Sequence, residues 1–301
     1  MRKLVVFIRI IIIVFIFCAA LSGCKTISEA AQAAGVPDAN DENTTIFINN
    51  SLKAIANAAE DMTPEQEYYI GRAVAANILN VYSLWKGSPA LTAYVNRICN
   101  AIVINSPKPE IYNGYHVEIL DSNEINAFAT SGGHIFITRG LIASAKSEDA
   151  LAGVIAHEIA HIQLQHSINA IKTSRITQAL MVTGVSAASA VTGYDVKELT
   201  SIFNETVGDI VSTLVNNGYS QLQEFEADET ALSLLASAGY NPGGLIDMLK
   251  ELENSQKGQS GGFNKTHPSP DKRLAAAQKA LANQPKVTDT SSYRRARFIN
   301  K

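Results

Sequence analysis

Apolar residues recur at helical spacing over most of the chain, and capping signals mark several of the helix starts. Thr63-Pro64-Glu65 offers an N-cap, a first-turn proline and an acid, and predicts a helix to about Trp85. Ser88-Pro89 repeats the signal for a helix to about Ile104, and Ser147 precedes another helix start with two acids. Further helices are expected at about 195–215, 220–238, 242–255 and 269–282.

One stretch of the chain follows the two-residue period of strands instead. Residues 115–120 alternate, residues 126–130 follow, and Gly132-Gly133 leads into His134–Thr138. We therefore expect a small antiparallel sheet of three or four strands within a mostly helical α+β fold.

The first 24 residues have a third pattern. Arg2 and Lys3 precede an apolar run from Leu4 to Ala20, which Arg9 interrupts, and Leu21-Ser22-Gly23-Cys24 follows. This order predicts a signal peptide over residues 1–23, and its end resembles the lipobox of bacterial lipoproteins, in which the cysteine is lipidated. The alternative is an uncleaved membrane anchor. A spanning helix needs about 20 apolar residues, and this run is shorter and interrupted.

Composition adds limits to this picture. The chain has 301 residues, of which 46% are hydrophobic and 18% are charged, so it can form a substantial core. A net charge of −3 gives no support for a nucleic-acid partner. Lipidation of Cys24 would leave Cys99 as the one free thiol of the mature chain, most simply a core residue, so no intramolecular disulfide is expected.

The same patterns suggest how the chain is divided. Small and polar residues over 24–50 predict a tether, and residues 51–285 are expected to form the folded domain. A glycine-rich loop at Gly258–Gly262 precedes the last helix, and residues 286–301 are expected to be a flexible tail.

The candidate chemistry begins with His157-Glu158-Ile159-Ala160-His161, on the helix that follows Ser147. Residues four apart share a helix face, so His157 and His161 can bind one zinc ion. Such an ion lowers the pKa of a bound water from near 16 to about 7, and Glu158 is placed to take the proton during attack on a peptide carbonyl. HExxH can also arise by coincidence, but three polar groups in an apolar helix would be costly without a partner.

A catalytic zinc ion needs a third protein ligand. Glu224 and Asp228 share a face of a helix well downstream, where Glu224 can bind the metal and Asp228 can accept a hydrogen bond from a ligand histidine. The alternative is a solvated helix start, because acids favour first turns, but the HExxH motif favours the ligand interpretation. Glu226 is expected to face solvent. The ligand types indicate one zinc ion per chain and leave iron or cobalt open.

The remaining histidines are interpreted without a role in the chemistry. His116 alternates within a strand and is expected to be structural or exposed, and His134 is expected at the surface, with contact to a substrate as the alternative. His166 follows His161 by five residues, which is off its helix face.

Several motifs, in this order, resemble the gluzincin peptidases of the CAAX-prenyl-protease and HtpX-like family. They cover about residues 63–282 and comprise Asn126-Ala127-Phe128-Ala129, Gly132-Gly133, Thr138-Arg139-Gly140-Leu141, the HExxH motif, Glu224-x-x-Ala227-Asp228, and His267-Pro268 with Arg273. The likeness is greatest to periplasmic members of the outer-membrane lipoprotein type. It implies a zincin-like metallopeptidase domain in which the small antiparallel sheet packs against the HExxH helix.

The resemblance also implies roles for individual residues. Glu224 would be the third zinc ligand, and His267 and Arg273 would lie across the cleft and stabilise the tetrahedral oxyanion. In related periplasmic proteins the His-Pro loop can also approach the metal and block it, and the Gly258–Gly262 loop would permit such gating. The strand that would bind substrate as an added edge strand consists of Gly133, His134, Ile135, Phe136 and Ile137.

These features together predict a membrane-anchored zinc metalloendopeptidase that hydrolyses unfolded or misassembled envelope proteins. A lipid on Cys24 would hold it in the bacterial cell envelope. Lys25, in place of an aspartate, favours the outer membrane, facing the periplasm, if the source is a diderm bacterium. Outer-membrane assembly machinery is an implied partner.

Two alternatives stay open. The first is an envelope chaperone or assembly lipoprotein whose zinc site is latent and covered by a loop. The second is a structural zinc domain, against which Glu158 argues, because a structural site has no use for a base beside the metal.

Overall fold

In the computed structural model, helix α7 (Glu148–Gln163) carries the HExxH motif, and all of its residues are buried. The hydroxyl of Ser147 caps it by accepting a hydrogen bond from Ala150 N–H, and Glu148 and Asp149 lie in its first turn, as predicted. A helix that is apolar on nearly every side must be enclosed by other elements. The structure describes residues 63–169, 208, 211–212, 218–255, 262–267 and 270–298, which all belong to one compact unit.

The helices around α7 begin close to the residues that the capping signals predict. Thr63 forms a capping box with Gln66 at the start of α4, and the Ser88 side chain caps α5. Helix α4 ends at Val81, earlier than expected, because Leu84 forms a bridge with Leu120. The helices other than α7 are α4 (Pro64–Val81), α5 (Pro89–Ile104), α6 (Arg139–Ser144), α10 (Gln221–Ser237), α11 (Gly243–Ser255), α12 (Phe263–Thr266), α13 (Pro270–Leu281) and α14 (Ser291–Phe298).

The sheet has three strands in the part of the chain that the structure describes: β1 (His116–Leu120), β2 (Ala127–Ala129) and β3 (His134–Thr138), in the order β1-β3-β2. Strand β2 pairs antiparallel with β3, but β1 pairs parallel with β3, so the sheet is mixed and the expectation of an antiparallel sheet is wrong. The connection after Leu120 carries the chain past the position of β3 before β2 begins. The alternation of apolar and polar residues indicates which face of the sheet each side chain occupies. It does not indicate whether neighbouring strands are parallel or antiparallel.

The predicted substrate-binding strand, Gly133 to Ile137, is also corrected by this order. Strand β3 is the central strand and is paired on both sides, so it offers no free edge to a substrate. Gly133, the first residue of that segment, belongs instead to the short 3-10 turn η1 (Ser131–Gly133). Gly132 has a φ of 76°, and a Cβ there would lie 2.5 Å from the Cα of Tyr68, so the turn and its contact with α4 both require glycine.

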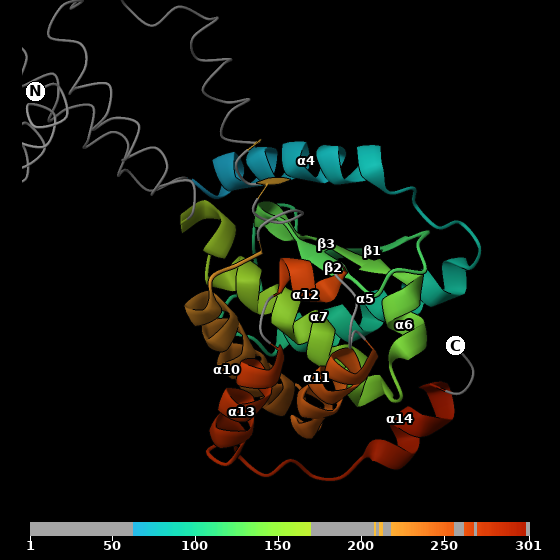
Figure 1. Ribbon diagram of the computed structural model, residues 1–301, viewed down its shortest axis with the longest axis vertical. Helices are drawn as coiled ribbons and strands as arrows, with labels where there is room; N and C mark the ends of the chain where they lie inside the picture. The colour runs from blue at the N-terminus through green and yellow to red at the C-terminus, as the bar shows by residue number, and fades with distance from the viewer. Residues whose placement is uncertain are drawn as a thin grey trace, which may run out of the picture. The chain divides into compact units, whose positions relative to one another are not determined.

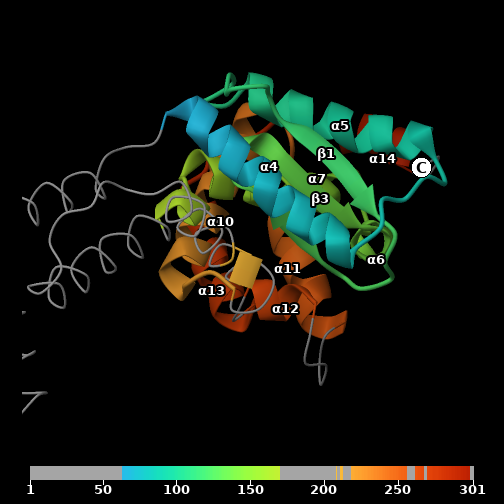
Figure 2. The ribbon, with the colours of Figure 1, turned by 90° about the horizontal axis from the view of Figure 1, so that it is seen from above.

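The elements lie in layers about α7. Helix α4 crosses the sheet on one side of α7, whereas α10, α11 and α13 lie on the other (Figure 1). Figure 2 shows α4 running beside β1 and β3. Helix α11 approaches α7 so closely that a Cβ on Gly244 would lie 2.3 Å from the carbonyl oxygen of Asp149. Cys99 is fully buried in the core, as expected. The mostly helical α+β fold is therefore confirmed.

The C-terminal segment differs from its prediction. Helix α14 occupies part of the range expected to be a flexible tail, and its Arg294 is buried and paired with Asp149 of α7. Contacts between residues this far apart in sequence leave no local signal. Among the described residues, no helix is both long and apolar enough to cross a membrane. The predicted signal peptide, the tether with Cys24, and most of the 195–215 helix and the Gly258–Gly262 loop lie outside the described residues.

Candidate active site

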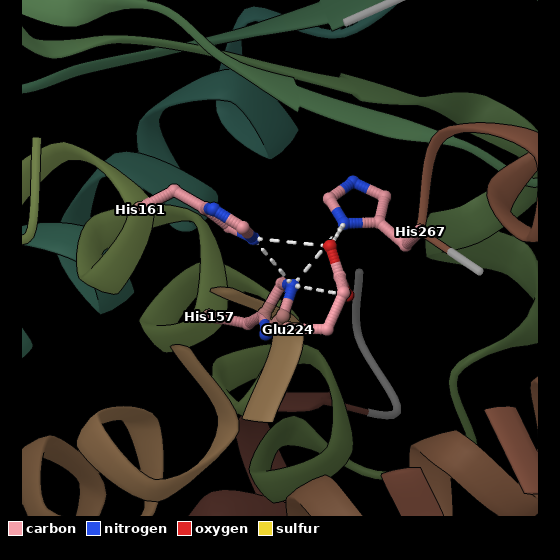
Figure 3. Close-up of side chains that lie close together, drawn as sticks. All are labelled: His157, His161, Glu224 and His267. Atoms are coloured by element: carbon pink, nitrogen blue, oxygen red, sulfur yellow. Dashed lines mark hydrogen bonds and ion pairs between the residues drawn. The ribbon is translucent and has the colours of Figure 1, made fainter. Parts of the chain in front are cut away.

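Three separate parts of the chain bring four buried side chains together. Helix α7 supplies His157 and His161, α10 supplies Glu224, and the residue after α12 is His267 (Figure 3). One ligand atom from each of the four lies within 4.8 Å of all the others, and each residue is at most 2% exposed. The spacing of the HExxH motif accounts for the first two, because one turn of α7 puts both rings on the same face.

The distances show how closely these atoms converge. His157 Nε2 lies 3.0 Å from His161 Nε2 and 3.5 Å from Glu224 Oε2, and His161 Nε2 lies 3.6 Å from Glu224 Oε1. His267 Nδ1 lies 3.2 Å from His157 Nε2 and 3.1 Å from Glu224 Oε1. A neutral imidazole carries one proton, so several ring nitrogens that face one another cannot all be hydrogen-bonded. A cation among them would interact favourably with the lone pair of each one. The donor set therefore fits a divalent metal ion of the transition series.

Glu158 lies beside this cluster and is fully buried, and neither of its carboxylate oxygens has a hydrogen-bond partner among the described residues. The nearest cation candidate is His267, whose Nε2 is 3.5 Å from Glu158 Oε1. Burial raises the pKa of Glu158, against the opposing effect of His267 and His157. A carboxylate with a raised pKa and free lone pairs is suited to accept a proton from a reacting water.

Asp228 holds the outer side of His157. Its Oδ1 lies 3.0 Å from His157 Nδ1, as expected for a carboxylate that orients a ligand histidine. Arg273 donates to both oxygens of Asp228, through Nε at 2.8 Å and Nη2 at 2.7 Å. Burial alone would raise the pKa of Asp228, but the charge and hydrogen bonds of Arg273 hold this pKa well below its usual range. Asp228 therefore stays ionised behind the site.

Arg273 does not have the position that the resemblance implies. It is fully buried, its third nitrogen, Nη1, is 2.9 Å from Glu224 Oε2, and the other two bind Asp228. Nε and Nη1 face carboxylates, and Nη2 lies between Asp228 and the ring of His157, 3.3 Å from its Nδ1, so all three nitrogens are engaged by groups of the site itself and Arg273 is not available as an oxyanion donor across a cleft. Burial alone would raise the pKa of Glu224. The positive charge of Arg273 outweighs this effect, so the pKa of Glu224 is lowered.

His267 is likewise found inside the ligand cluster and not across a cleft from it. Its ring stacks on Phe263 with centroids 4.3 Å apart. Burial opposes protonation of His267, but Glu224 and Glu158 raise its pKa. The segment is tied down at two points: Phe263 N–H donates to Ile125 C=O at 2.8 Å, and Thr266 Oγ1–H donates to Asn126 Oδ1 at 2.9 Å. These contacts hold His267 where a metal ion would bind.

Two residues at the site have no role in the sequence interpretation. His166 is buried, with its Nδ1 2.8 Å from Nδ1 of His161, and Tyr219 stacks on the His161 ring at 4.0 Å. The helical spacing that sets His166 apart does not apply, because α7 ends at Gln163 and Gln165 has a φ of 54°. The chain turns there and brings His166 back to the site. No glycine or proline marks this turn, so the sequence gives little warning of it.

The other expected positions are simpler. His116 is exposed and His134 is partly exposed, in line with their interpretation as residues outside the chemistry, and Glu226 is exposed on α10. The predicted Glu224–Asp228 face is present, since both are buried whereas Glu226 is not.

A buried HExxH helix whose histidines meet a glutamate from a second helix defines the gluzincin class of metallopeptidase sites. The family model described as Peptidase family M48 matches residues 89–281, which is more than half of the chain. The chain belongs to peptidase family M48. The resemblance to the CAAX-prenyl-protease and HtpX-like peptidases is therefore confirmed, since these names describe the same family.

Individual relatives agree with this assignment. The β-barrel assembly-enhancing protease of Escherichia coli (strain K12) is 26% identical over 280 residues, which cover 91% of this chain and 54% of that protein. The mitochondrial metalloendopeptidase OMA1 of Schizosaccharomyces pombe is 29% identical over 206 residues, 66% of this chain and 56% of that protein. Metalloprotease LoiP of Escherichia coli is 29% identical over 190 residues, 62% and 70% of the two chains. The chain spans about half the length of most curated relatives it matches.

Proposed function

We propose that this protein is a zinc metalloendopeptidase that hydrolyses peptide bonds in unfolded or misassembled proteins of the bacterial envelope. Glu158 carries the proposal: a fully buried carboxylate, with no hydrogen-bond partner in the part of the chain that the structure describes, lies beside four convergent ligand atoms. A structural metal site needs no such group. Burying a carboxylate without hydrogen bonds costs free energy, and a role in the reaction would explain why this one is kept. Zinc fits the histidine and glutamate donors, at one ion per chain.

In this mechanism His157, His161 and Glu224 would hold the ion. A bound zinc ion supplies Lewis acidity, which activates water near neutral pH and polarises a peptide carbonyl. Glu158 takes the proton of the attacking water and then delivers it to the leaving amine, for which its raised pKa is suited. Asp228 keeps His157 in the tautomer and orientation that a ligand needs.

The closed arrangement suggests a gate. A catalytic site needs room for water and substrate beside its three protein ligands, whereas His267 brings a fourth donor atom in among those of His157, His161 and Glu224. We propose that the segment from Phe263 to His267 moves away before substrate enters. The same segment binds Ile125 and Asn126, which precede β2, so its departure would also uncover the outer side of β2 for an added substrate strand.

The activity is tested by comparing wild type with Glu158→Gln for degradation of casein, an unfolded substrate, and by measuring bound zinc in both. The proposal expects zinc to be retained and degradation to fall by about 10²–10⁴-fold, the usual contribution of a general base. Glu229→Gln, an exposed acid on α10, is the matched control and should leave degradation unchanged. Equal degradation by wild type and Glu158→Gln would overturn the proposal.

The gate has a separate test. His267→Ala removes the fourth donor, and we expect faster casein degradation than by wild type. Thr266→Val keeps the side-chain shape but loses the hydrogen bond to Asn126, so a smaller increase is expected. A fall in both variants would instead assign His267 a direct part in catalysis.

Cys24 and the relatives support a proposal for where the protein acts. We propose that a lipid on Cys24 holds the domain at the outer membrane, facing the periplasm. Relatives named β-barrel assembly-enhancing protease suggest outer-membrane assembly machinery and its misassembled clients as partners. Replacing Cys24 with alanine should release the protein from the membrane fraction, and retention there would contradict the lipid anchor.

A second function is favoured by the burial of the whole ligand cluster. With His267 in place the protein could act as an envelope chaperone or assembly lipoprotein whose zinc site stays latent. In that case wild type would degrade little casein, and Glu158→Gln would support envelope assembly in cells as well as wild type does.

A further inference from the structure

The two ring nitrogens of His161 face opposite sides of the site. Nε2 points into the ligand cluster, 3.0 Å from His157 Nε2 and 3.6 Å from Glu224 Oε1. Nδ1 points outward and lies 2.8 Å from Nδ1 of His166. Because His166 is 97% buried, no solvent competes for this contact. His161 can therefore bind a metal through one nitrogen only, and the other nitrogen is committed to His166.

This arrangement restricts where the protons can be. Nε2 of a neutral His161 can bind a cation only if the ring proton is on Nδ1. That proton then needs an acceptor, and the group within reach is Nδ1 of His166. His166 can accept there only if its own proton is on Nε2, which lies 3.4 Å from Glu226 Oε2. The carboxylate of Glu226 favours this tautomer because it attracts the outward N–H.

We propose that His166, supported by Glu226, is a positioning residue that fixes the tautomer and orientation of His161 as a metal ligand. The inference rests on the proposed function, because it assumes a metal ion held by His157, His161 and Glu224. Two other contacts keep the pair in place. Gln223 Nε2 donates to the His166 carbonyl at 3.4 Å, and Tyr219 stacks on the His161 ring and limits its rotation.

The two metal-binding histidines are then held in different ways. His157 reaches its carboxylate directly, at Asp228, which is 1% exposed and paired with Arg273. His161 reaches its carboxylate through an interposed imidazole, and the side chain of Glu226 is 51% exposed. Water can replace much of what Glu226 does at Nε2 of His166, but it cannot reach the buried contact between Nδ1 of His166 and Nδ1 of His161. Loss of His166 should therefore weaken metal binding far more than loss of Glu226.

The competing explanation is that His166 only fills space between α7 and α10. Two substitutions of nearly equal shape separate the explanations. His166→Asn keeps an acceptor oxygen close to the position of Nδ1, whereas His166→Leu has the same branching and no acceptor. A space-filling role makes the two variants equal. If His166 positions His161, the asparagine variant should keep the zinc affinity that the leucine variant loses.

The test measures the dissociation constant for zinc by competition with a chromophoric chelator, together with the visible spectrum of the cobalt(II) protein. We expect His166→Leu to weaken zinc binding by about 10–100-fold and to alter the cobalt spectrum. His166→Asn should stay within about threefold of wild type, and Glu226→Gln should weaken binding by only a few-fold. Glu229→Gln is the exposed control and should change nothing. Thermal melting of each metal-free variant checks that the comparison uses folded protein.

Equal zinc affinity for the leucine and asparagine variants, whether unchanged or equally weakened, would overturn the inference and leave the proposed peptidase standing. A wild-type protein that binds no zinc would overturn the inference and the proposed function together. The two failures are therefore distinguishable.

Discussion

Helix α7 carries two buried glutamates in opposite environments. Glu148, in the first turn, is 1% exposed and receives hydrogen bonds from Tyr94 Oη at 2.8 Å and Tyr240 Oη at 3.1 Å, and it pairs with Arg297 of α14. Glu158, ten residues later, is fully buried, and neither of its oxygens has a hydrogen-bond partner among the described residues. Two glutamates on the same helix are thus both excluded from solvent, but among the described residues one receives several hydrogen bonds and the other receives none.

The difference separates a structural acid from a reactive one. Burial tends to raise the pKa of both, but hydrogen bonds from Arg297 and Tyr94 bring the pKa of Glu148 below its ordinary value, whereas that of Glu158 stays raised. Buried polar groups are normally hydrogen-bonded, so an unmatched one points to a partner that arrives during function. The number of donors around a buried acid, more than its burial, indicates its role here.

The largest effect on stability should follow from Glu148→Gln. The change removes the negative charge that Tyr94, Tyr240 and Arg297 all contact. A hydrogen bond to a charged group contributes about 1.5–3 kcal/mol to the free energy of unfolding. We expect the free energy of unfolding to fall by about 2 kcal/mol, or the melting temperature by about 4–8 °C. Activity per folded molecule should be retained. A variant as stable as wild type would contradict the structural role assigned to Glu148.

Acid should weaken the same cluster. The pKa of Glu148 is lower in the folded state than in the unfolded chain, where a glutamate titrates near about 4.3. Its contribution is therefore present above that pH and is lost as pH falls through the folded-state pKa. Urea midpoints of wild type and Glu148→Gln, compared from neutral pH downwards, should differ most near neutrality and converge in acid. A gap that is constant with pH would contradict this assignment.

Glu158→Gln should act in the opposite direction on the metal-free protein. An amide is less costly to bury than a carboxylate without partners, so we expect the metal-free variant to be more stable by about 1 kcal/mol. Thermal melting in excess chelator measures this. A loss of stability equal to that of Glu148→Gln would show that both acids are structural.

The smallest effect is expected from Arg297→Ala. The side chain of Arg297 is 55% exposed, and ion pairs that water reaches contribute about 0–1 kcal/mol. The two tyrosines still satisfy Glu148 in this variant. Unfolding in urea should show a loss below that of Glu148→Gln, and a larger loss would mean that α14 holds α7 more strongly than its exposure indicates.

The sequence predicts those features of the site that depend on residues close together along the chain. The Ser147 cap, the two histidines four apart and Glu158 between them all lie within one helix, where spacing determines which side chains meet. The Glu224–Asp228 pair follows from the same rule on α10. The helical signals therefore predict most of the fold and the ligand set.

The remainder depends on contacts that spacing does not encode. Arg297 and Glu148 are 149 residues apart, so the segment that contains α14 carries no sign that it packs. Strand order makes β3 central and not an edge, because pairing direction is decided by the connections. His166 reaches His161 only because α7 ends at Gln163, a stop that no glycine or proline announces.

Of the two buried glutamates on α7, Glu158 is proposed to serve the reaction and Glu148 to serve stability. The direct measurement is casein degradation per folded, zinc-loaded molecule for Glu158→Gln and Glu148→Gln, at a temperature where both variants are folded. We expect a loss of about 10²–10⁴-fold for Glu158→Gln and activity close to wild type for Glu148→Gln. Similar activities for the two variants, whether both high or both low, would contradict it.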